Sequence, residues 1–205
     1  FFPSIGEFYY NEQKPFVEGV DKELKHLTIE LDPMDLHKKI DSRLTTDSPR
    51  DIMFKNFVGM LNSHKGGRLF FGITDSGRVV GIPNFNRSHI DELQREIQQN
   101  IFSNISVYDI SEDKIIGNVD PNNITFVWHW VYHYTAESPE EAPKPEYPER
   151  WVLEIQIASA RHLESNIEPK FIYMGPLPDR KIWYRIAGAT KEICKDEAKI
   201  IAKQK

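Results

Sequence analysis

The chain has 205 residues, of which 40% are hydrophobic and 12% aromatic, so it can bury one sizeable core, which argues against global disorder. Its net charge is −5 at pH 7, whereas free-standing nucleic-acid binders are more often basic. Any polyanion site must therefore be a local basic patch, a metal site or a groove completed by another chain. The single cysteine, Cys194, excludes an internal disulfide and a cysteine-based zinc site, and it fits a reducing compartment, the cytosol or nucleus.

The hydropathy pattern predicts a soluble protein. No apolar run approaches the roughly 18 residues that a membrane helix needs, and we recognise no signal peptide at the N-terminus. The first residue is Phe rather than Met, so we expect a domain excised from a longer chain, with any targeting signal outside it.

The N-terminal quarter of the chain has few regular patterns. Residues 1–17 are aromatic and irregular, and we expect them to lie over the core. Residues 23–31 alternate between polar and apolar side chains, which predicts a strand. The polar stretch 32–48 predicts a loop insertion with a short helix at 33–40.

The strongest predicted helix begins at Pro49, which suits the first helical position, with Ser48 as its N-cap. Its apolar side chains recur three and four residues apart and form one stripe: Phe54, Phe57, Val58 and Leu61. The glycine pair at 66–67 ends the helix, because glycine adopts the left-handed C-terminal conformation at low cost.

The segment after this helix predicts a buried strand and a hairpin. The continuous apolar run 69–73 is typical of a strand covered on both faces. Asp75, Ser76 and Gly77 then form a turn, and 78–82 returns as the hairpin partner of that strand.

The remaining segments predict an α+β fold in which a mixed β-sheet is flanked by helices. The proline- and glutamate-rich segment 135–150 is expected to be an exposed loop insertion within a single domain that covers 1–205. The other predicted elements are a helix at 87–103, strands at 105–117 and 124–134 joined by a turn at 120–123, strands at 151–158 and 181–186, and a helix at 190–203.

Glu18, Glu23 and Lys25 are the first candidates for chemistry. A strand places Glu23 and Lys25 on one face, where a carboxylate could hold a divalent metal and an ammonium could offset charge on a phosphate. A bend at Gly19 would be needed to bring Glu18 alongside. All candidate ligands are oxygens, which favours Mg²⁺ or Mn²⁺. In a chain with 28% charged residues, the spacing alone favours a solvated strand face over a metal site.

Other side chains carry a structural and a functional interpretation. Asp75 is an ordinary turn former that could also be a metal ligand at the end of a rigid strand. His129 and His133 share a face and are interpreted as partly buried histidines rather than metal ligands. Lys65, next to His64, complements the C-terminal end of the helix dipole or meets a phosphate. Cys194 is expected at a core position on the last helix.

Two segments resemble the Schlafen family and its AlbA-like relatives. The second, 184–190, is similar to a segment near the end of that family's domain. The first resembles a family signature that joins an F-K-x-F-V helix, an asparagine, a glycine pair, an F-F-G-[IV] strand, an acidic turn and V-x-G. Its matching residues here are Phe54, Lys55, Phe57, Val58, Asn62, Gly66, Gly67, Leu69, Phe70, Phe71, Gly72, Ile73, Asp75, Val80 and Gly81.

The resemblance implies a metal-dependent endoribonuclease. Schlafen-type ribonucleases carry an acidic triad of the form E-x-x-x-x-E-[FV]-K plus an Asp after the F-F-G-[IV] strand. Glu18, Glu23 and Lys25 match the first part, with Leu24 in place of Phe or Val, and Asp75 matches the second. Basic side chains near the site are expected to track the RNA backbone: Lys22, Lys55, Lys65, Arg68 and Arg78.

The departures from the family pattern point to a partner. Many vertebrate members have a Cys/His zinc site, which one cysteine cannot build, so no zinc is expected. Full Schlafen cores join two lobes around a basic groove, whereas this chain offers one acidic lobe, so a second Schlafen-like chain is expected as a homo- or heterodimer partner. Single-lobe relatives that process the 5′ ends of piRNA precursors are the analogue. A non-catalytic partner and a nucleic-acid-binding regulator remain the alternatives.

Overall fold

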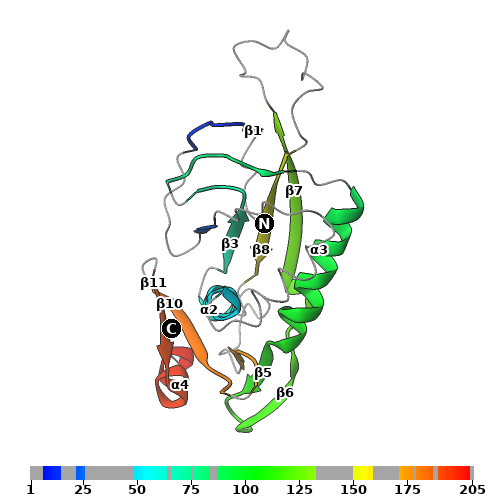
Figure 1. Cartoon of the computed structure of the whole chain (residues 1–205). Coiled ribbons are helices and arrows are strands. Elements are labelled where there is room, and N and C mark those ends of the chain that lie inside the picture. Colours follow the sequence, from blue (N-terminus) through cyan, green and yellow to red (C-terminus); the bar gives the residue numbers. More distant parts are fainter. Residues whose placement is uncertain are drawn as a thin grey trace.

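The computed structural model describes residues 7–14, 22–25, 49–63, 66–74, 76–83, 87–132, 150–158, 171–177, 179–186 and 189–203. Its architecture is α+β: a curled mixed sheet and two smaller sheets, with helices packed between and against them (Figure 1). The predicted fold class is therefore confirmed. The insertion predicted at 32–48 and the helix at 33–40 are not described, and of the loop predicted at 135–150 only Arg150 is described, as the first residue of a strand.

The main sheet has the strand order β1-β7-β8-β3-β2, and β4 also pairs with β8. Its strands are β1 (Phe8–Tyr9), β2 (Lys22–Lys25), β3 (Gly67–Phe71), β4 (Ile82–Pro83), β7 (Ile124–Tyr132) and β8 (Arg150–Ile157). The central neighbours β7, β8 and β3 are antiparallel, whereas β1 runs parallel to β7 and β2 runs parallel to β3. All five residues of β3 are buried, as the apolar run predicted.

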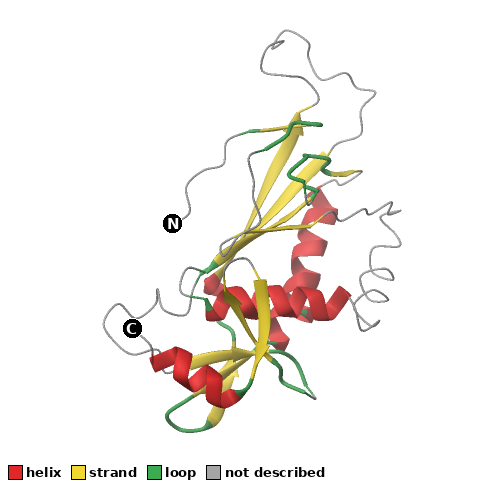
Figure 2. Ribbon diagram, turned by 90° about the vertical axis from the view of Figure 1, so that its left-hand side faces the viewer, coloured by secondary structure: helices red, strands yellow, loops and turns green. Residues whose placement is uncertain are grey.

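Helix α2 (Pro49–Asn62) begins at the predicted residue and lies between the main sheet and the smaller sheets (Figure 2). The predicted stripe, with Phe54 and Leu61 at its ends, is fully buried. Met60 and Asn56 on other sides of the helix are buried as well. Between Phe54 and Leu61 only Lys55 is exposed, because sheets pack against this part of the helix from more than one side.

The smaller sheets are built from the second half of the chain. One has the order β6-β5-β9, and the other pairs β10 with β11. Their strands are β5 (Ser106–Asp109), β6 (Lys114–Asn118), β9 (Phe171–Met174), β10 (Ile182–Ile186) and β11 (Ala189–Ile193). Helix α3 (Arg87–Asn100) runs along the main sheet, α4 (Lys195–Lys203) closes the chain, and two short 3₁₀ helices are η2 (Phe102–Asn104) and η3 (Pro121–Asn123) (Figure 1).

Four predicted elements differ from the structure. The strand predicted at 105–117 is the hairpin β5–β6, which turns at Asp113 with a φ of 54°. The segment 78–82 was predicted to pair with the strand before the turn. It forms a single β-bridge to that side of the turn, between Val79 and Ile73, and its strand β4 pairs with β8 instead. The helix predicted at 190–203 is β11 followed by α4. Part of the N-terminal segment is strand β1, whose Phe8 is fully buried.

Candidate functional site

Strand β2 forms one edge of the main sheet and carries Glu23 and Lys25. It runs parallel to β3, with Glu23 beside Leu69 and Lys25 beside Phe71. Because the strands are parallel, their carboxyl ends lie at the same end of the sheet. The segment that follows β3 therefore leaves the sheet at the end where Lys25 is placed.

A tight turn follows the carboxyl end of β3. Thr74 and Arg78 close it, since the amide of Thr74 donates to the carbonyl of Arg78 at 2.9 Å and the Thr74 hydroxyl accepts from the Arg78 amide at 3.0 Å. Gly77 has a φ of 86°, which favours glycine. Lys14 donates its amide to the carbonyl of Gly77 at 3.0 Å, so the N-terminal segment supports the turn.

The convergence of the three carboxylates stays a prediction. Glu18 and Asp75 lie outside the described residues, as do Lys65 and His133, and β2 is described through its backbone. Among the residues that are described, no group of three or more His, Cys, Asp or Glu side chains is placed to hold a metal ion.

The predicted RNA-contacting residues occupy different environments. Lys55 on α2 and Arg78 beside the turn are exposed, and Lys22 lies beside Arg68 in the β2–β3 register. Arg68 is 4% exposed, and its Nη1 lies 3.6 Å from Oε1 of Glu154. In this conformation Arg68 is directed into the protein, so its predicted contact with RNA would need a rearrangement.

Glu154 is the centre of a buried polar cluster that the sequence pattern did not reveal. Its side chain is 2% exposed on β8 and contacts His129 Nε2 at 2.8 Å, while Gln156 Nε2 donates to it at 2.9 Å. The ring of Phe8 covers His129 with a centroid separation of 4.8 Å. The available signal was a glutamate and a glutamine at alternate positions of an otherwise apolar strand. His129 is partly buried, as predicted from the sequence.

Asn62, which belongs to the signature shared with the Schlafen family, joins α2 to the smaller sheets through hydrogen bonds. Its Nδ2 donates to the carbonyls of Tyr173 and Trp183, each at 2.9 Å, and its Oδ1 accepts from the Tyr173 amide at 2.8 Å. Burial raises the pKa of Tyr173, although the hydrogen bond from Asn123 acts in the opposite direction. The signature asparagine is thus explained by packing, because it satisfies backbone groups on two strands.

The signature glycines also have structural roles. Gly72 and Gly81 have φ values of 93° and 66°, and a Cβ built on Gly72 would lie 3.1 Å from the Cα of Gly81. The φ of Gly67 is not in the left-handed region, but a Cβ built on this residue would lie 2.6 Å from Sδ of Met60. Side chains at these positions would separate β3 from the elements that hold it.

Cys194 is exposed and precedes α4, which corrects the predicted core position on the last helix. Its amide donates to the carboxylate of Glu197 at 3.0 Å, and the Glu197 amide donates to Sγ of Cys194 at 3.4 Å. This reciprocal arrangement is a capping box with cysteine in the place of serine or threonine. The hydrogen bond from the Cys194 amide lowers the pKa of Glu197.

Comparison with known proteins gives one informative match. No helix among the described residues is long and apolar enough to cross a membrane, and no curated protein matches the chain significantly. A family model described as Schlafen, AlbA_2 matches residues 30–194, so the match includes Asp75 and begins after Glu18, Glu23 and Lys25. It spans well over half of the 205 residues. The chain therefore belongs to the Schlafen, AlbA_2 family, which has nuclease and nucleic-acid-binding members.

Proposed function

We propose that this chain is a metal-dependent endoribonuclease subunit in RNA processing. Glu18, Glu23 and Asp75 are the metal ligands, and Lys25 contacts the scissile phosphate. The proposal joins two findings: membership of a family with nuclease members and the position of the strand that carries Glu23 and Lys25 at the edge of the main sheet.

The observation that carries the proposal is the parallel pairing of β2 with β3. Glu23 is beside Leu69 and Lys25 beside Phe71, so both are held by the strand whose carboxyl end leads to the turn at 74–78. Glu23 and the turn at 74–78 are far apart in sequence, yet β2 pairs with β3, the strand that precedes this turn. A site on a rigid strand edge also suits catalysis better than one on an isolated loop.

The donor set fits a hard divalent cation. Three carboxylates supply only oxygen, which suits Mg²⁺ or Mn²⁺ and does not suit zinc in a structural site. A bound cation would activate water and stabilise charge on the phosphate. Glu18, Glu23 and Asp75 hold and orient the site, while the ammonium of Lys25 offsets negative charge that develops on the phosphate oxygens.

The charge of the chain supports assembly with a partner. A net charge of −5 repels RNA at long range, so a basic surface supplied by another chain would assist binding. We propose a second Schlafen-like chain, either identical or related, as that partner. The proposed substrates are small or structured RNAs, with piRNA precursors as the first to test.

The proposal is tested by cleavage of labelled RNA with Mg²⁺ or Mn²⁺, using the chain together with its candidate partner. Glu23→Gln and Asp75→Asn should each lower the rate about a thousandfold or more, because each removes a ligand that stabilises the transition state. Asp91→Asn is the matched control, since Asp91 is an exposed acid on α3. It should leave the rate unchanged.

The outcomes separate catalysis from binding. Loss of cleavage with RNA binding retained in Glu23→Gln supports the nuclease assignment. Cleavage by Glu23→Gln and Asp75→Asn at the parent rate contradicts it, and would leave the chain as a non-catalytic partner or an RNA-binding regulator.

A further inference from the structure

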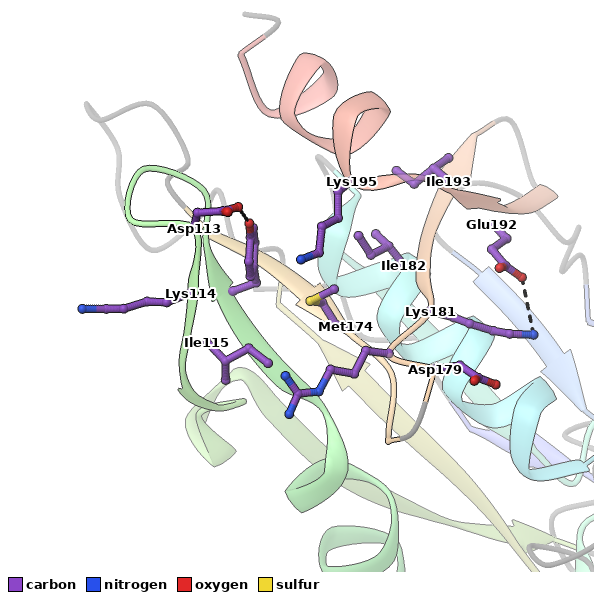
Figure 3. A pocket seen from close by; sticks show the side chains of 12 residues that line it. Asp113, Lys114, Ile115, Met174, Asp179, Lys181, Ile182, Glu192, Ile193 and Lys195 are labelled. Atoms are coloured by element: carbon purple, nitrogen blue, oxygen red, sulfur yellow. Dashed lines mark hydrogen bonds and ion pairs between the residues drawn. The ribbon is translucent and has the colours of Figure 1, made fainter.

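A cavity of about 530 Å³ lies between the smaller sheets and the start of α4 (Figure 3). Four segments enclose it: the β5–β6 hairpin, the loop between β9 and β10, the end of β11 and the first residue of α4. Its volume is within the range of small-molecule sites.

The floor of the cavity is apolar and rigid. Met174, Ile182 and Ile193 come from three different strands, line the cavity and are each less than a tenth exposed. They belong to the hydrophobic cluster that also holds Tyr108 and Ala198. Such a floor suits a flat apolar group better than it suits a fully hydrated ion.

Two cations at the cavity have no carboxylate partner among the described residues. Lys195 extends from the start of α4 towards Met174, and its Nζ lies 4.7 Å from the ring centroid of Tyr108 (Figure 3). Arg180 lines the cavity, and its Nε is buried without a hydrogen-bond partner in the described part of the chain. A buried guanidinium donor left unsatisfied is costly, so an acceptor from a ligand would stabilise this loop.

Four of the five other charged residues that line the cavity are paired within the protein, whereas Asp179 is an exposed carboxylate with no ion pair among the described residues. Lys181 lies 3.6 Å from Glu192, and Asp113 lies 3.3 Å from Lys199. Lys114 points away from the cavity (Figure 3) and pairs with Glu112. Arg180 and Lys195 are therefore the groups available to an anion, and they lie above an apolar floor.

We propose that this cavity binds one nucleotide of an RNA chain, outside the cleavage site. Arg180 and Lys195 contact the phosphate, and the base lies over Met174, Ile182 and Ile193. The inference rests on the proposed function, because an RNA-processing chain encounters phosphates linked to bases whose flat π-faces can lie on an apolar floor. A guanidinium suits phosphate because its donors match two oxygens at once.

The test is fluorescence anisotropy with a labelled six-nucleotide oligouridylate, in EDTA so that metal-dependent binding and cleavage are absent. Arg180→Asn keeps a residue that tolerates the φ of 46° found at this position. Both Arg180→Asn and Lys195→Gln should raise the Kd about tenfold or more. Each should also lower the salt dependence of binding by roughly 0.7 in the log–log slope, as expected for one lost phosphate contact.

Lys191→Gln is the matched control, because Lys191 is an exposed lysine of β11 that does not line the cavity. It should bind like the parent chain, and circular dichroism should show that all variants are folded. AMP should compete with the oligouridylate better than inorganic phosphate does. Equal competition by phosphate would overturn the nucleotide assignment, and parent-like affinity in Arg180→Asn and Lys195→Gln would overturn the site itself.

Glu23→Gln separates this inference from the proposed function. It should bind the oligouridylate in EDTA like the parent chain, yet fail to cleave RNA when metal is present. Unchanged binding in the cavity variants, together with loss of cleavage in Glu23→Gln, would refute the cavity alone. Weakened binding in the cavity variants, with normal cleavage by Glu23→Gln, would refute the nuclease assignment alone.

Discussion

Replacing Glu154 by Gln removes a negative charge from the interior of the main sheet. The carboxylate is 2% exposed, contacts His129 at 2.8 Å and lies 3.6 Å from Arg68, whose side chain is 5% exposed. Removing one member of a buried charge pair typically costs about 3–5 kcal/mol, because the other charge remains in the interior. Gln keeps part of the hydrogen bonding, so we expect a loss of about 3 kcal/mol, or roughly 6–12 °C in Tm for a chain of this size.

Urea unfolding followed by circular dichroism measures this loss. Glu192→Gln is the control, because its pair with Lys181 is exposed and should contribute less than about 1 kcal/mol. The double variant Arg68→Met/Glu154→Gln should lose less than the sum of the single losses, since residues in contact are coupled. An unfolding midpoint of Glu154→Gln equal to that of the parent chain would show that the buried carboxylate does not stabilise the sheet.

Three further predictions concern other parts of the fold. Asn62→Ala should lower the free energy of unfolding by about 2–3 kcal/mol in urea titrations, because three hydrogen bonds to strands β9 and β10 are lost; a loss below about 0.5 kcal/mol would contradict this. The raised pKa of Tyr173 means that folding favours the neutral phenol, so stability should fall as the pH rises above its ordinary value of 10.0, and Tyr173→Phe should lose less stability over that range. The lowered pKa of Glu197 contributes stability above its ordinary value of 4.5 that is lost as the pH falls through the lower folded value. Thermal melts from pH 6 to pH 3 should therefore show a weaker acid dependence in Glu197→Gln, and identical profiles would contradict it.

Local signals predicted the elements whose stability is largely local. Pro49 marks the start of α2, and the 3–4 spacing from Phe54 to Leu61 identifies its buried stripe. The apolar run of β3 likewise predicted a buried strand, and the segment 151–158 was correctly predicted as a strand, β8. These patterns succeed because burial on a helix face or in a sheet leaves a regular spacing of apolar residues.

The errors fall where tertiary pairing decides the structure. Residues 189–193 have no clear strand pattern, yet they form β11 by pairing along all of β10. The return segment after the turn at 74–78 pairs through β4 with β8, a partner that local sequence does not specify. The charge of Glu154 is stabilised by Arg68 and His129 from two other strands, so neither its burial nor its partners can be read from its own segment.

In the candidate site, too, local sequence predicted the residues, whereas tertiary pairing decided their neighbours. The sequence identified Glu23 and Lys25 by spacing and resemblance, and a strand with both residues is present at the edge of the sheet. Its pairing with β3 could not be predicted, because the two strands are separated by a helix and a long connecting segment. The cavity above Met174 and Ile182 likewise depends on segments brought together only by folding.

Metal binding by the three carboxylates is tested most directly by a crystal structure of the chain soaked with Mn²⁺, measured for anomalous scattering. We expect a peak at the carboxyl end of β2, within bonding distance of the carboxylates of Glu18, Glu23 and Asp75. Carboxylates on separate surfaces, with no peak among them at saturating Mn²⁺, would contradict it.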